Sequence, residues 1–217
     1  MSINSKLKIK ICGIKRLKDA KKAFELGADF LGFIFYKPSP RNIIQSEAKK
    51  ILAILPSTIS KVAVFVDEDI EKVIKIAKQL KFDYVQLHGQ ESSAYINAIK
   101  RERIKVIKSF PLKLKTDLKE IMNCKADLVL VDNISADLRG GSGKKFNWDI
   151  RIPVAVDNLV LSGGLNKYNI IEGIKKFKPL VVDINSGVES KPGMKSGEKL
   201  KEIFKQINKL RCNGKLS

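Results

Sequence analysis

Short aliphatic runs alternate with longer amphipathic stretches along all 217 residues of the chain. The short runs are rich in valine, isoleucine, leucine and phenylalanine, which is typical of buried strands. We expect eight strands, over Leu7–Cys12, Phe30–Phe35, Lys61–Val66, Tyr84–His88, Ile104–Lys108, Leu128–Asp132, Leu159–Ser162 and Leu180–Asn185. The amphipathic stretches carry apolar residues at helical spacing. We expect seven helices, over Leu17–Leu26, Ser46–Leu55, Ile70–Leu80, Glu91–Arg101, Leu114–Asn123, Lys167–Phe177 and Gly197–Leu210.

Eight strands, each followed by a connection long enough to cross back, predict a closed parallel barrel. The segment after Asp132 is the exception, because a glycine-rich loop and the short stretch Phe146–Ile150 stand where a sixth helix belongs. An open doubly wound sheet is the alternative, but no Gly-x-Gly-x-x-Gly motif follows the first strand. The sequence therefore predicts an α/β fold, a single (β/α)8 TIM barrel domain over residues 1–217.

The balance of charge is strongly basic. The chain has 42 Lys and Arg residues against 23 Asp and Glu residues, a formal net charge of +19. Such a balance raises nucleic-acid binding as a hypothesis. The lysines, however, are spread over almost every predicted helix, and few aromatic residues lie among them at a spacing suited to base stacking. We therefore expect a solvated basic surface and no nucleic-acid partner.

Several classes of protein are excluded by what the chain does not contain. No apolar run approaches the roughly 20 residues of a membrane span. The N-terminal apolar run is broken by Lys8 and Lys10, unlike a signal peptide. The three cysteines form no Cys-x-x-Cys pair and His88 is the only histidine, so neither a disulfide framework nor a metal site is expected. These features indicate a cytoplasmic enzyme without membrane association.

The first predicted strand ends in a thiol. Side chains alternate along a strand, so Lys10 and Cys12 share one face and Ile9 and Ile11 the other. If the aliphatic pair packs on the outer helices, the lysine and the thiol point into the barrel together. A nearby ammonium favours thiolate and lowers the pKa of a cysteine. Two interpretations of Cys12 stay open, a reactive thiol or a small buried hydrophobic residue.

The carboxyl ends of other strands, where enzymes of this fold carry their chemistry, also hold polar residues. Asp132 ends an otherwise apolar strand, and such a carboxylate either takes part in chemistry or caps the following loop. Asp183 lies just inside the end of the last strand, and we expect it to pair with Lys10 across the barrel. His88 ends the fourth strand on the same face as Gln86.

Loops after the later strands are rich in glycine. They are Gly140-Gly141-Ser142-Gly143, Ser162-Gly163-Gly164 and Asn185-Ser186-Gly187. Glycines let backbone N–H groups converge on an anion, and loops after the last two strands form the usual phosphate site of this fold. Arg41 lies on the loop after the second strand, which Pro38 and Pro40 stiffen. A guanidinium held there can bind a carboxylate through two parallel hydrogen bonds.

Seven segments resemble, in order and spacing, the successive signatures of one family, phosphoribosylanthranilate isomerase. They are Lys10-Ile11-Cys12-Gly13-Ile14, Gly32-Phe33-Ile34-Phe35-Tyr36 with Ser39-Pro40-Arg41, Val64-Phe65-Val66, Gln86-Leu87-His88-Gly89, Gly140-Gly141-Ser142-Gly143-Lys144 with Phe146-Asn147-Trp148, Leu161-Ser162-Gly163-Gly164-Leu165, and Asp183-Ile184-Asn185-Ser186-Gly187-Val188-Glu189. The resemblance extends from about residue 7 to residue 204.

This resemblance implies an Amadori rearrangement in tryptophan biosynthesis, which converts N-(5-phosphoribosyl)anthranilate to 1-(2-carboxyphenylamino)-1-deoxyribulose 5-phosphate without a cofactor. It implies that Cys12 is the general base, Asp132 the general acid and Arg41 the residue that binds the substrate carboxylate. The phosphate loops fall on Gly141, Ser142, Gly143, Gly163, Gly164, Ser186 and Gly187. We also expect Lys10, His88 and Asp183 in the substrate site. The expected partner is a phosphorylated small molecule, bound by a monomer or homodimer.

The chain departs from the family pattern at three positions. Lys15 stands where the family commonly has Thr, Asn133 where it has Thr or Ser, and Asn185 where it usually has Ser. None of these positions carries a catalytic role. The nearest rival is another phosphate-binding barrel, such as a thiamine phosphate synthase or a sugar-phosphate epimerase; the epimerase would be expected to show metal-binding histidines.

Overall fold

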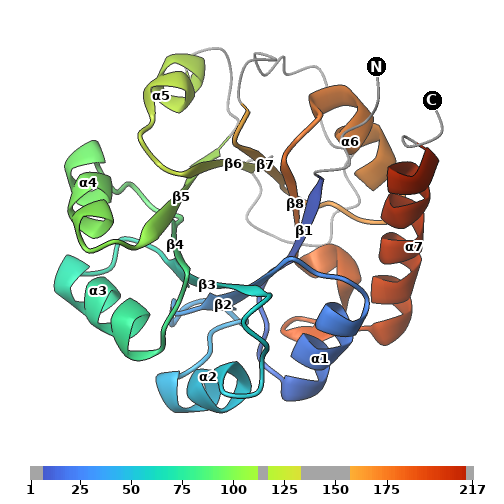
Figure 1. Cartoon of the computed structure of the whole chain (residues 1–217), viewed down its shortest axis with the longest axis horizontal. Coiled ribbons are helices and arrows are strands. Elements are labelled where there is room, and N and C mark those ends of the chain that lie inside the picture. The colour runs from blue at the N-terminus through green and yellow to red at the C-terminus, as the bar shows by residue number, and fades with distance from the viewer. Residues whose placement is uncertain (1–6, 112–116, 133–156, 214–217) are drawn as a thin grey trace.

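A closed ring of parallel strands forms the centre of the molecule (Figure 1). The computed structural model describes residues 7–111, 117–132 and 157–213. Within these ranges the ring runs in chain order through β1 (Lys8–Ile11), β2 (Phe30–Ile34), β3 (Ser60–Phe65), β4 (Tyr84–Leu87), β5 (Lys105–Pro111), β6 (Leu128–Asp132), β7 (Leu159–Ser162) and β8 (Val181–Ile184). Because β8 pairs back to β1, the predicted (β/α)8 barrel is confirmed.

Helices surround the ring on its outside (Figure 1). They are α1 (Leu17–Glu25), α2 (Gln45–Leu52), α3 (Ile70–Gln79), α4 (Ser93–Arg101), α5 (Asp117–Asn123), α6 (Ile170–Phe177) and α7 (Gly197–Asn213). Each presents an apolar stripe to the strands; in α2, for example, Ala48, Ile51 and Leu52 are buried. None of the helices in the described ranges is both long and apolar enough to cross a membrane.

The period of two along the strands divides the apolar side chains into two layers. Ile9 and Ile11 belong to the larger core, which lies between the strands and the helices. Cys12, Val62 and Leu130 belong to a smaller cluster that fills the barrel interior. The parity prediction for the first strand is therefore confirmed, and the thiol faces inward.

Several element boundaries differ by one to three residues from the sequence expectation, and the structure shows the cause of two of these differences. The fifth strand continues to Pro111, because β5 stays paired with β6 as far as the register pair Pro111 and Asp132. Helix α6 begins at Ile170, three residues later than predicted. There, asparagine side chains bind local backbone: Asn166 Oδ1 accepts from Tyr168 N at 2.9 Å, and Asn169 Oδ1 accepts from Asn166 N at 2.8 Å. Such bonds compete with the first helical turn.

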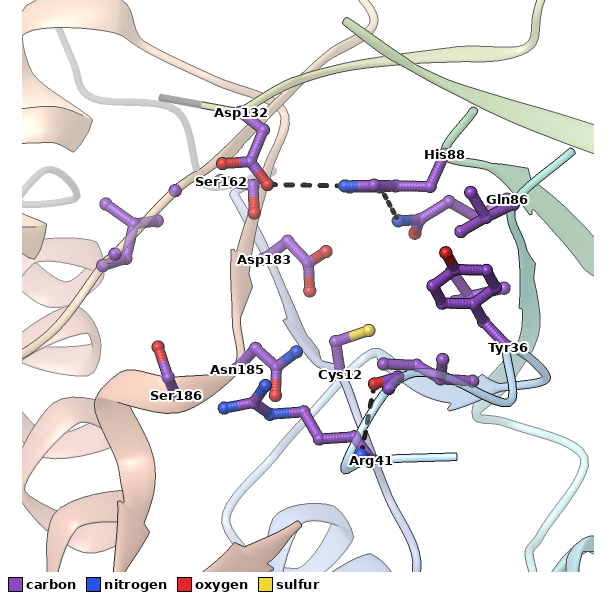
Figure 2. Close-up of a pocket in the computed structure, with 17 residues that line it drawn as sticks. Cys12, Tyr36, Arg41, Gln86, His88, Asp132, Ser162, Asp183, Asn185 and Ser186 are labelled. Carbon is purple, nitrogen blue, oxygen red and sulfur yellow. Dashed lines mark hydrogen bonds and ion pairs between the residues drawn. The ribbon is translucent and has the colours of Figure 1, made fainter. Parts of the chain in front are cut away.

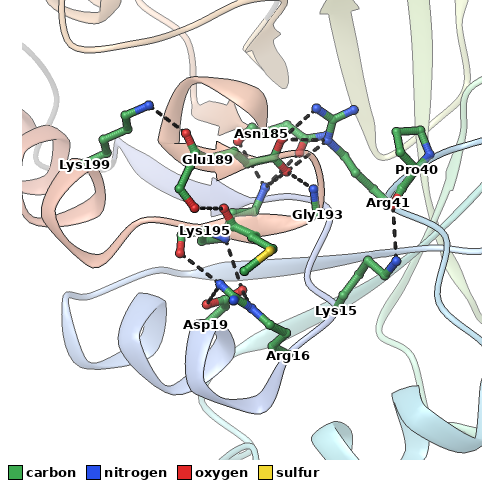
Figure 3. A network of polar contacts seen from close by, with 12 residues as sticks. Lys15, Arg16, Asp19, Pro40, Arg41, Asn185, Glu189, Gly193, Lys195 and Lys199 are labelled. Atoms are coloured by element: carbon green, nitrogen blue, oxygen red, sulfur yellow. Dashed lines mark hydrogen bonds and ion pairs between the residues drawn. The ribbon is translucent and has the colours of Figure 1, made fainter.

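A small hairpin between β8 and α7 was outside the sequence prediction. After a 3-10 turn (Ser186–Val188), β9 (Glu189–Lys191) pairs antiparallel with β10 (Met194–Lys195). The hairpin is tied to α1, because Lys195 N donates to Asp19 Oδ2 at 3.2 Å and Arg16 Nη2 donates to Lys195 O at 3.1 Å (Figure 3). The hairpin therefore lies beside the carboxyl ends of β8 and β1.

Candidate active site

A cavity of about 490 Å³ opens at the carboxyl ends of the strands, a size suited to a small-molecule ligand (Figure 2). Its lining combines aliphatic walls with polar groups at the ends of β1, β4, β6, β7 and β8 and on the loop after β2. The lining residues are Cys12, Ile34, Tyr36, Ser39, Arg41, Val64, Val66, Gln86, His88, Asp132, Ser162, Gly163, Gly164, Leu165, Asp183, Asn185 and Ser186. The structure thus brings together most of the predicted site residues, which come from distant parts of the chain.

Cys12 follows the last residue of β1 and points its thiol into this cavity (Figure 2). Its backbone N–H donates to Ile184 O at 2.9 Å, so the strand direction continues through the cysteine. On the neighbouring strand, a Cβ added to Gly32 would lie only 2.8 Å from the Cys12 Sγ. The thiol therefore occupies space that only a glycine at position 32 leaves free.

Lys10 lies beneath the cavity and is fully buried. Its Nζ donates to Asp183 Oδ2 and to Gln86 Oε1, each at 2.7 Å. The expected pairing with Asp183 is confirmed, but its placement across the barrel is wrong: the two residues are register partners on adjacent strands, because closure of the ring sets β8 beside β1. Lys10 is not among the lining residues, so its ammonium holds its neighbours rather than facing the cavity.

The electrostatics of Cys12 differ from the sequence expectation. Burial raises the pKa of the thiol, and this effect outweighs the opposing charges of Lys10 and Lys195; the carboxylate of Asp183 raises it further. As expected, the charge of Lys10 by itself lowers the pKa of Cys12. The expectation of a lowered pKa is nevertheless wrong, because burial raises the pKa by more. The ammonium itself stays charged, because Asp183 and Cys12 more than offset the burial that would lower the pKa of Lys10.

Asp132 ends β6 on the opposite side of the cavity from Cys12 (Figure 2). Its side chain is 18% exposed. Burial raises the pKa of this carboxyl to about 6, with a further contribution from the negative charge of Asp183 and a smaller opposing one from Lys10. A carboxyl with this pKa exists in both protonation states near neutral pH, as a general acid requires.

His88 and Gln86 connect the two sides of the cavity. The Gln86 Nε2 lies 3.2 Å from the His88 Nδ1, and the His88 Nε2 lies 3.7 Å from the Asp132 Oδ2 (Figure 2). Burial lowers the pKa of His88, chiefly assisted by the positive charge of Lys10, so the imidazole is neutral at pH 7. Among the described residues no group of three or more His, Cys, Asp and Glu side chains could hold a metal ion.

Arg41 lines the cavity from the loop after β2, but it is already engaged by a carboxylate of the protein. Its Nε and Nη2 donate to Glu189, at 3.0 and 2.7 Å for the closest contacts (Figure 3). Glu189 also accepts from Lys195 Nζ at 3.0 Å and from Gly193 N at 3.1 Å. Burial alone would raise the pKa of Glu189, but these cations hold it below its ordinary value. Within the described ranges, the Arg41 Nη1 has no hydrogen-bond partner.

The sequence reasoning missed this support for Arg41. Lys195 belongs to β10 of the hairpin and is buried, and its Nζ also donates to the Asn185 Oδ1 at 2.8 Å. The Pro192–Gly193 dipeptide is a turn signal that could have revealed the hairpin. No local pattern, however, indicates that the hairpin would reach back to a loop almost 150 residues earlier.

The predicted phosphate loops are only partly described. Gly163, Gly164 and Ser186 line the cavity. Gly187 does not line it, and a Cβ at this position would lie 1.9 Å from Leu165 O, so glycine there permits the loop after β8 to pack on the loop after β7. Gly141, Ser142 and Gly143 lie outside the described residues.

The whole chain is similar to proteins of one family. Residues 9–206 match the family described as N-(5'phosphoribosyl)anthranilate (PRA) isomerase. The N-(5'-phosphoribosyl)anthranilate isomerase of Trichlorobacter lovleyi is 40% identical over 201 residues, which are 92% of this chain and 97% of that protein. The counterpart in Thermotoga petrophila is 39% identical over 206 residues, covering 94% of this chain and 100% of that protein.

Solved structures agree with this likeness. The crystal structure of phosphoribosyl anthranilate isomerase from Thermotoga maritima has a TM-score of 0.85 and 37% identity, covering 94% of this chain and 99% of that one. Another isomerase structure, bound to reduced 1-(o-carboxyphenylamino)-1-deoxyribulose 5-phosphate, has a TM-score of 0.82 and 36% identity, with 94% and 99% of the two chains covered. A 3-hexulose-6-phosphate synthase from Salmonella typhimurium, with a TM-score of 0.69 and 14% identity, shares only the fold. The chain therefore belongs to the N-(5'-phosphoribosyl)anthranilate isomerase family and is an isomerase.

Proposed function

We propose that this enzyme converts N-(5-phosphoribosyl)anthranilate to 1-(2-carboxyphenylamino)-1-deoxyribulose 5-phosphate in tryptophan biosynthesis, with Asp132 as general acid and Cys12 as general base. One observation carries the assignment of roles. A carboxyl whose pKa is raised to about 6 and a buried thiol occupy opposite sides of one cavity of substrate size (Figure 2). A molecule bound between them has one proton donor and one proton acceptor on its two flanks.

The reaction then needs two proton transfers by these side chains, followed by a tautomerisation in which the C2 hydroxyl loses a proton and C1 gains one, and it needs no cofactor. Asp132 donates its proton to the ribose ring oxygen while the C1–O bond breaks and the aniline nitrogen forms a Schiff base. The Cys12 thiolate removes the proton from C2 and gives an enolamine, which tautomerises to the ketone. Substrate and product are isomers, so atoms and electrons balance within the molecule itself.

The pKa directions make the reactive form of the free enzyme a minor one. The Asp132 carboxyl has a pKa of about 6, and burial raises the pKa of the Cys12 thiol above its ordinary value. Between these two values, the share of molecules with a protonated acid and a deprotonated base is constant. That share is small, because the pKa of the base lies above that of the acid. The enzyme therefore works by reverse protonation, with most molecules carrying a carboxylate and a thiol.

Groups that line the cavity suit the two charged groups of the substrate. The Arg41 guanidinium, oriented by Glu189, faces the cavity and suits the anthranilate carboxylate. Gly163, Gly164 and Ser186 suit the phosphate. The buried Asp183 Oδ1 has no partner within the described residues, so it can accept from a sugar hydroxyl.

The test is rescue of a tryptophan auxotroph that lacks this isomerase step, followed by steady-state kinetics on the purified enzyme. The parent restores growth, whereas Cys12→Ala and Asp132→Asn do not, and both variants keep the circular dichroism of the parent. Cys212→Ala is the matched control, because that cysteine is exposed on α7. Growth of either active-site variant at the parent rate would refute the acid–base assignment; failure of the parent to rescue would refute the reaction itself.

The setting that this function suggests is the cytoplasm, with the enzyme as a monomer or homodimer and a phosphorylated small molecule as its partner. A Thermotoga maritima structure similar to this chain, with a TM-score of 0.81 and 35% identity, is described as monomers of a dimeric phosphoribosylanthranilate isomerase.

A further inference from the structure

A continuous line of polar contacts joins the buried Lys10–Asp183 pair to Asp132 on the far side of the cavity. The Lys10 Nζ donates to the Gln86 Oε1 at 2.7 Å, and the Gln86 Nε2 lies 3.2 Å from the His88 Nδ1. The His88 Nε2 then faces the Asp132 Oδ2 at 3.7 Å (Figure 2). Gln86 and His88 share a face of β4 and its extension, so both side chains reach this line without leaving their strand.

The chemistry of the first contact fixes the direction of all the others. An ammonium only donates hydrogen bonds, so the group of Gln86 that faces Lys10 is its carbonyl oxygen. The amide nitrogen, which also only donates, is therefore the group that faces His88. The His88 Nδ1 must accept, and an imidazole that accepts at Nδ1 is neutral and carries its proton on Nε2.

The surrounding charges act on the same ring from several elements. Lys10 on β1 and Lys108 on β5 disfavour an imidazolium, and burial acts in the same direction. The carboxylates of Asp183 and Glu91 oppose them, and the Asp132 carboxylate lies opposite Nε2. Burial and the lysines prevail, so the pKa of His88 is lowered and the neutral ring agrees with the hydrogen-bond geometry.

We propose that His88 is a positioning residue for the acid step, with Gln86 and Lys10 holding its Nε2–H toward Asp132. This inference rests on the proposed role of Asp132. When Asp132 gives its proton to the substrate oxygen, a carboxylate is left in a mostly buried position. The Nε2–H stabilises that carboxylate as it forms, and the 3.7 Å separation closes to a hydrogen bond when substrate fills the cavity.

No proton moves along this line in the proposed step. The proton of Asp132 passes to the ring oxygen, and His88 keeps its own proton throughout. Neutrality matters here, because an imidazolium at the same place would favour the carboxylate before the reaction starts and would weaken the acid. A neutral N–H donor stabilises the Asp132 carboxylate that the proton transfer leaves, and it lowers the pKa of the protonated carboxyl less than an imidazolium would.

The single histidine of the chain makes the tautomer directly measurable. The untagged protein is labelled with 15N-histidine, and the two imidazole nitrogens of His88 are observed by NMR at neutral pH. The expected spectrum has an unprotonated Nδ1 and a protonated Nε2, with a histidine pKa below 6.5. A proton on Nδ1, or an imidazolium at neutral pH, would overturn the proposal.

The isosteric Gln86→Glu variant tests the cause. A carboxylate still accepts from Lys10 but offers no N–H to His88, so the proton moves to Nδ1 or the ring becomes charged. An unchanged Nε2–H signal in the folded variant would show that Gln86 does not set the tautomer.

The steady-state activity of His88 variants gives a second test, which holds even if Gln86→Glu does not fold. His88→Phe removes the donor and lowers kcat at least about tenfold with little change in KM, whereas His88→Gln keeps an N–H and retains most of kcat. Equal kcat values in both variants and the parent would overturn the proposal. The proposed role of His88 and the proposed function can fail separately. The NMR experiment tests the His88 tautomer without turnover, whereas a parent enzyme that fails to isomerise the substrate refutes the proposed function alone.

Discussion

Asp132 is held in its ionised form at a cost to the stability of the folded protein, and replacing it by asparagine removes this cost. The carboxyl has a pKa of about 6 in the fold, against about 3.9 in an unfolded chain. Asparagine has the shape of the protonated carboxyl and cannot ionise. We therefore expect Asp132→Asn to be more stable than the parent at neutral and alkaline pH, although it is inactive.

The magnitude follows from linkage between proton binding and folding. Below pH 4 both folded and unfolded Asp132 are protonated, and the residue contributes no difference. As the pH rises from about 4 to 6, the unfolded chain releases its proton first, so the free energy of unfolding of the parent falls. The loss is complete above about pH 7, and a pKa difference of about 2 units corresponds to about 3 kcal/mol. The side chain is only 18% exposed, so solvent screens this effect little.

The measurement is urea unfolding of parent and variant at a series of pH values from about 4 to 8, analysed for the free energy of unfolding. The gain of Asp132→Asn is expected to grow from near zero at the acid end to about 3 kcal/mol at the alkaline end. For a domain of this size, the same gain is a rise in Tm of about 6 to 12 °C.

The pH dependence of the stability gain distinguishes an ionisation effect from a change in packing, which would be independent of pH. A gain that is the same at every pH, or no gain at pH 8, would refute the assignment of a raised pKa to Asp132. Glu25→Gln is the matched control, because Glu25 is exposed on α1 in a surface ion pair with Lys22 and its loss leaves stability nearly unchanged across the range.

Two further predictions concern catalysis. The logarithm of kcat/KM is expected to fall below about pH 6 and again above the raised pKa of Cys12, with a plateau between the two. Steady-state rates measured from acid to alkaline pH check this profile, and a plateau that ends near pH 7 would contradict the effect of burial on the thiol. Glu189→Gln weakens the orientation of Arg41 and raises KM about tenfold with a smaller change in kcat, because a neutral amide replaces a bidentate carboxylate. An unchanged KM in that variant would mean that Arg41 holds its geometry without Glu189.

The strand count, the closed barrel and the inward direction of Lys10 and Cys12 followed from the sequence by itself. Their cause is local: a strand has a side-chain period of two, and parallel strands joined by crossovers present their carboxyl ends at one mouth. The same logic placed Asp132 and His88 at that mouth, and the series of family motifs indicated the substrate that the proposed function assigns to the site.

Tertiary structure alone decided how these groups behave. Lys10 lies near Cys12 as the parity predicted, yet the pKa of the thiol is raised, because desolvation depends on everything that covers a group and not on one neighbour. Ring closure made Asp183 the adjacent partner of Lys10. The contact of Glu189 with Arg41 joins segments far apart in the chain, and no local pattern encodes such a contact. The sequence thus determined most of the groups that surround the cavity, and the fold determined which of them line it, their protonation and their direction.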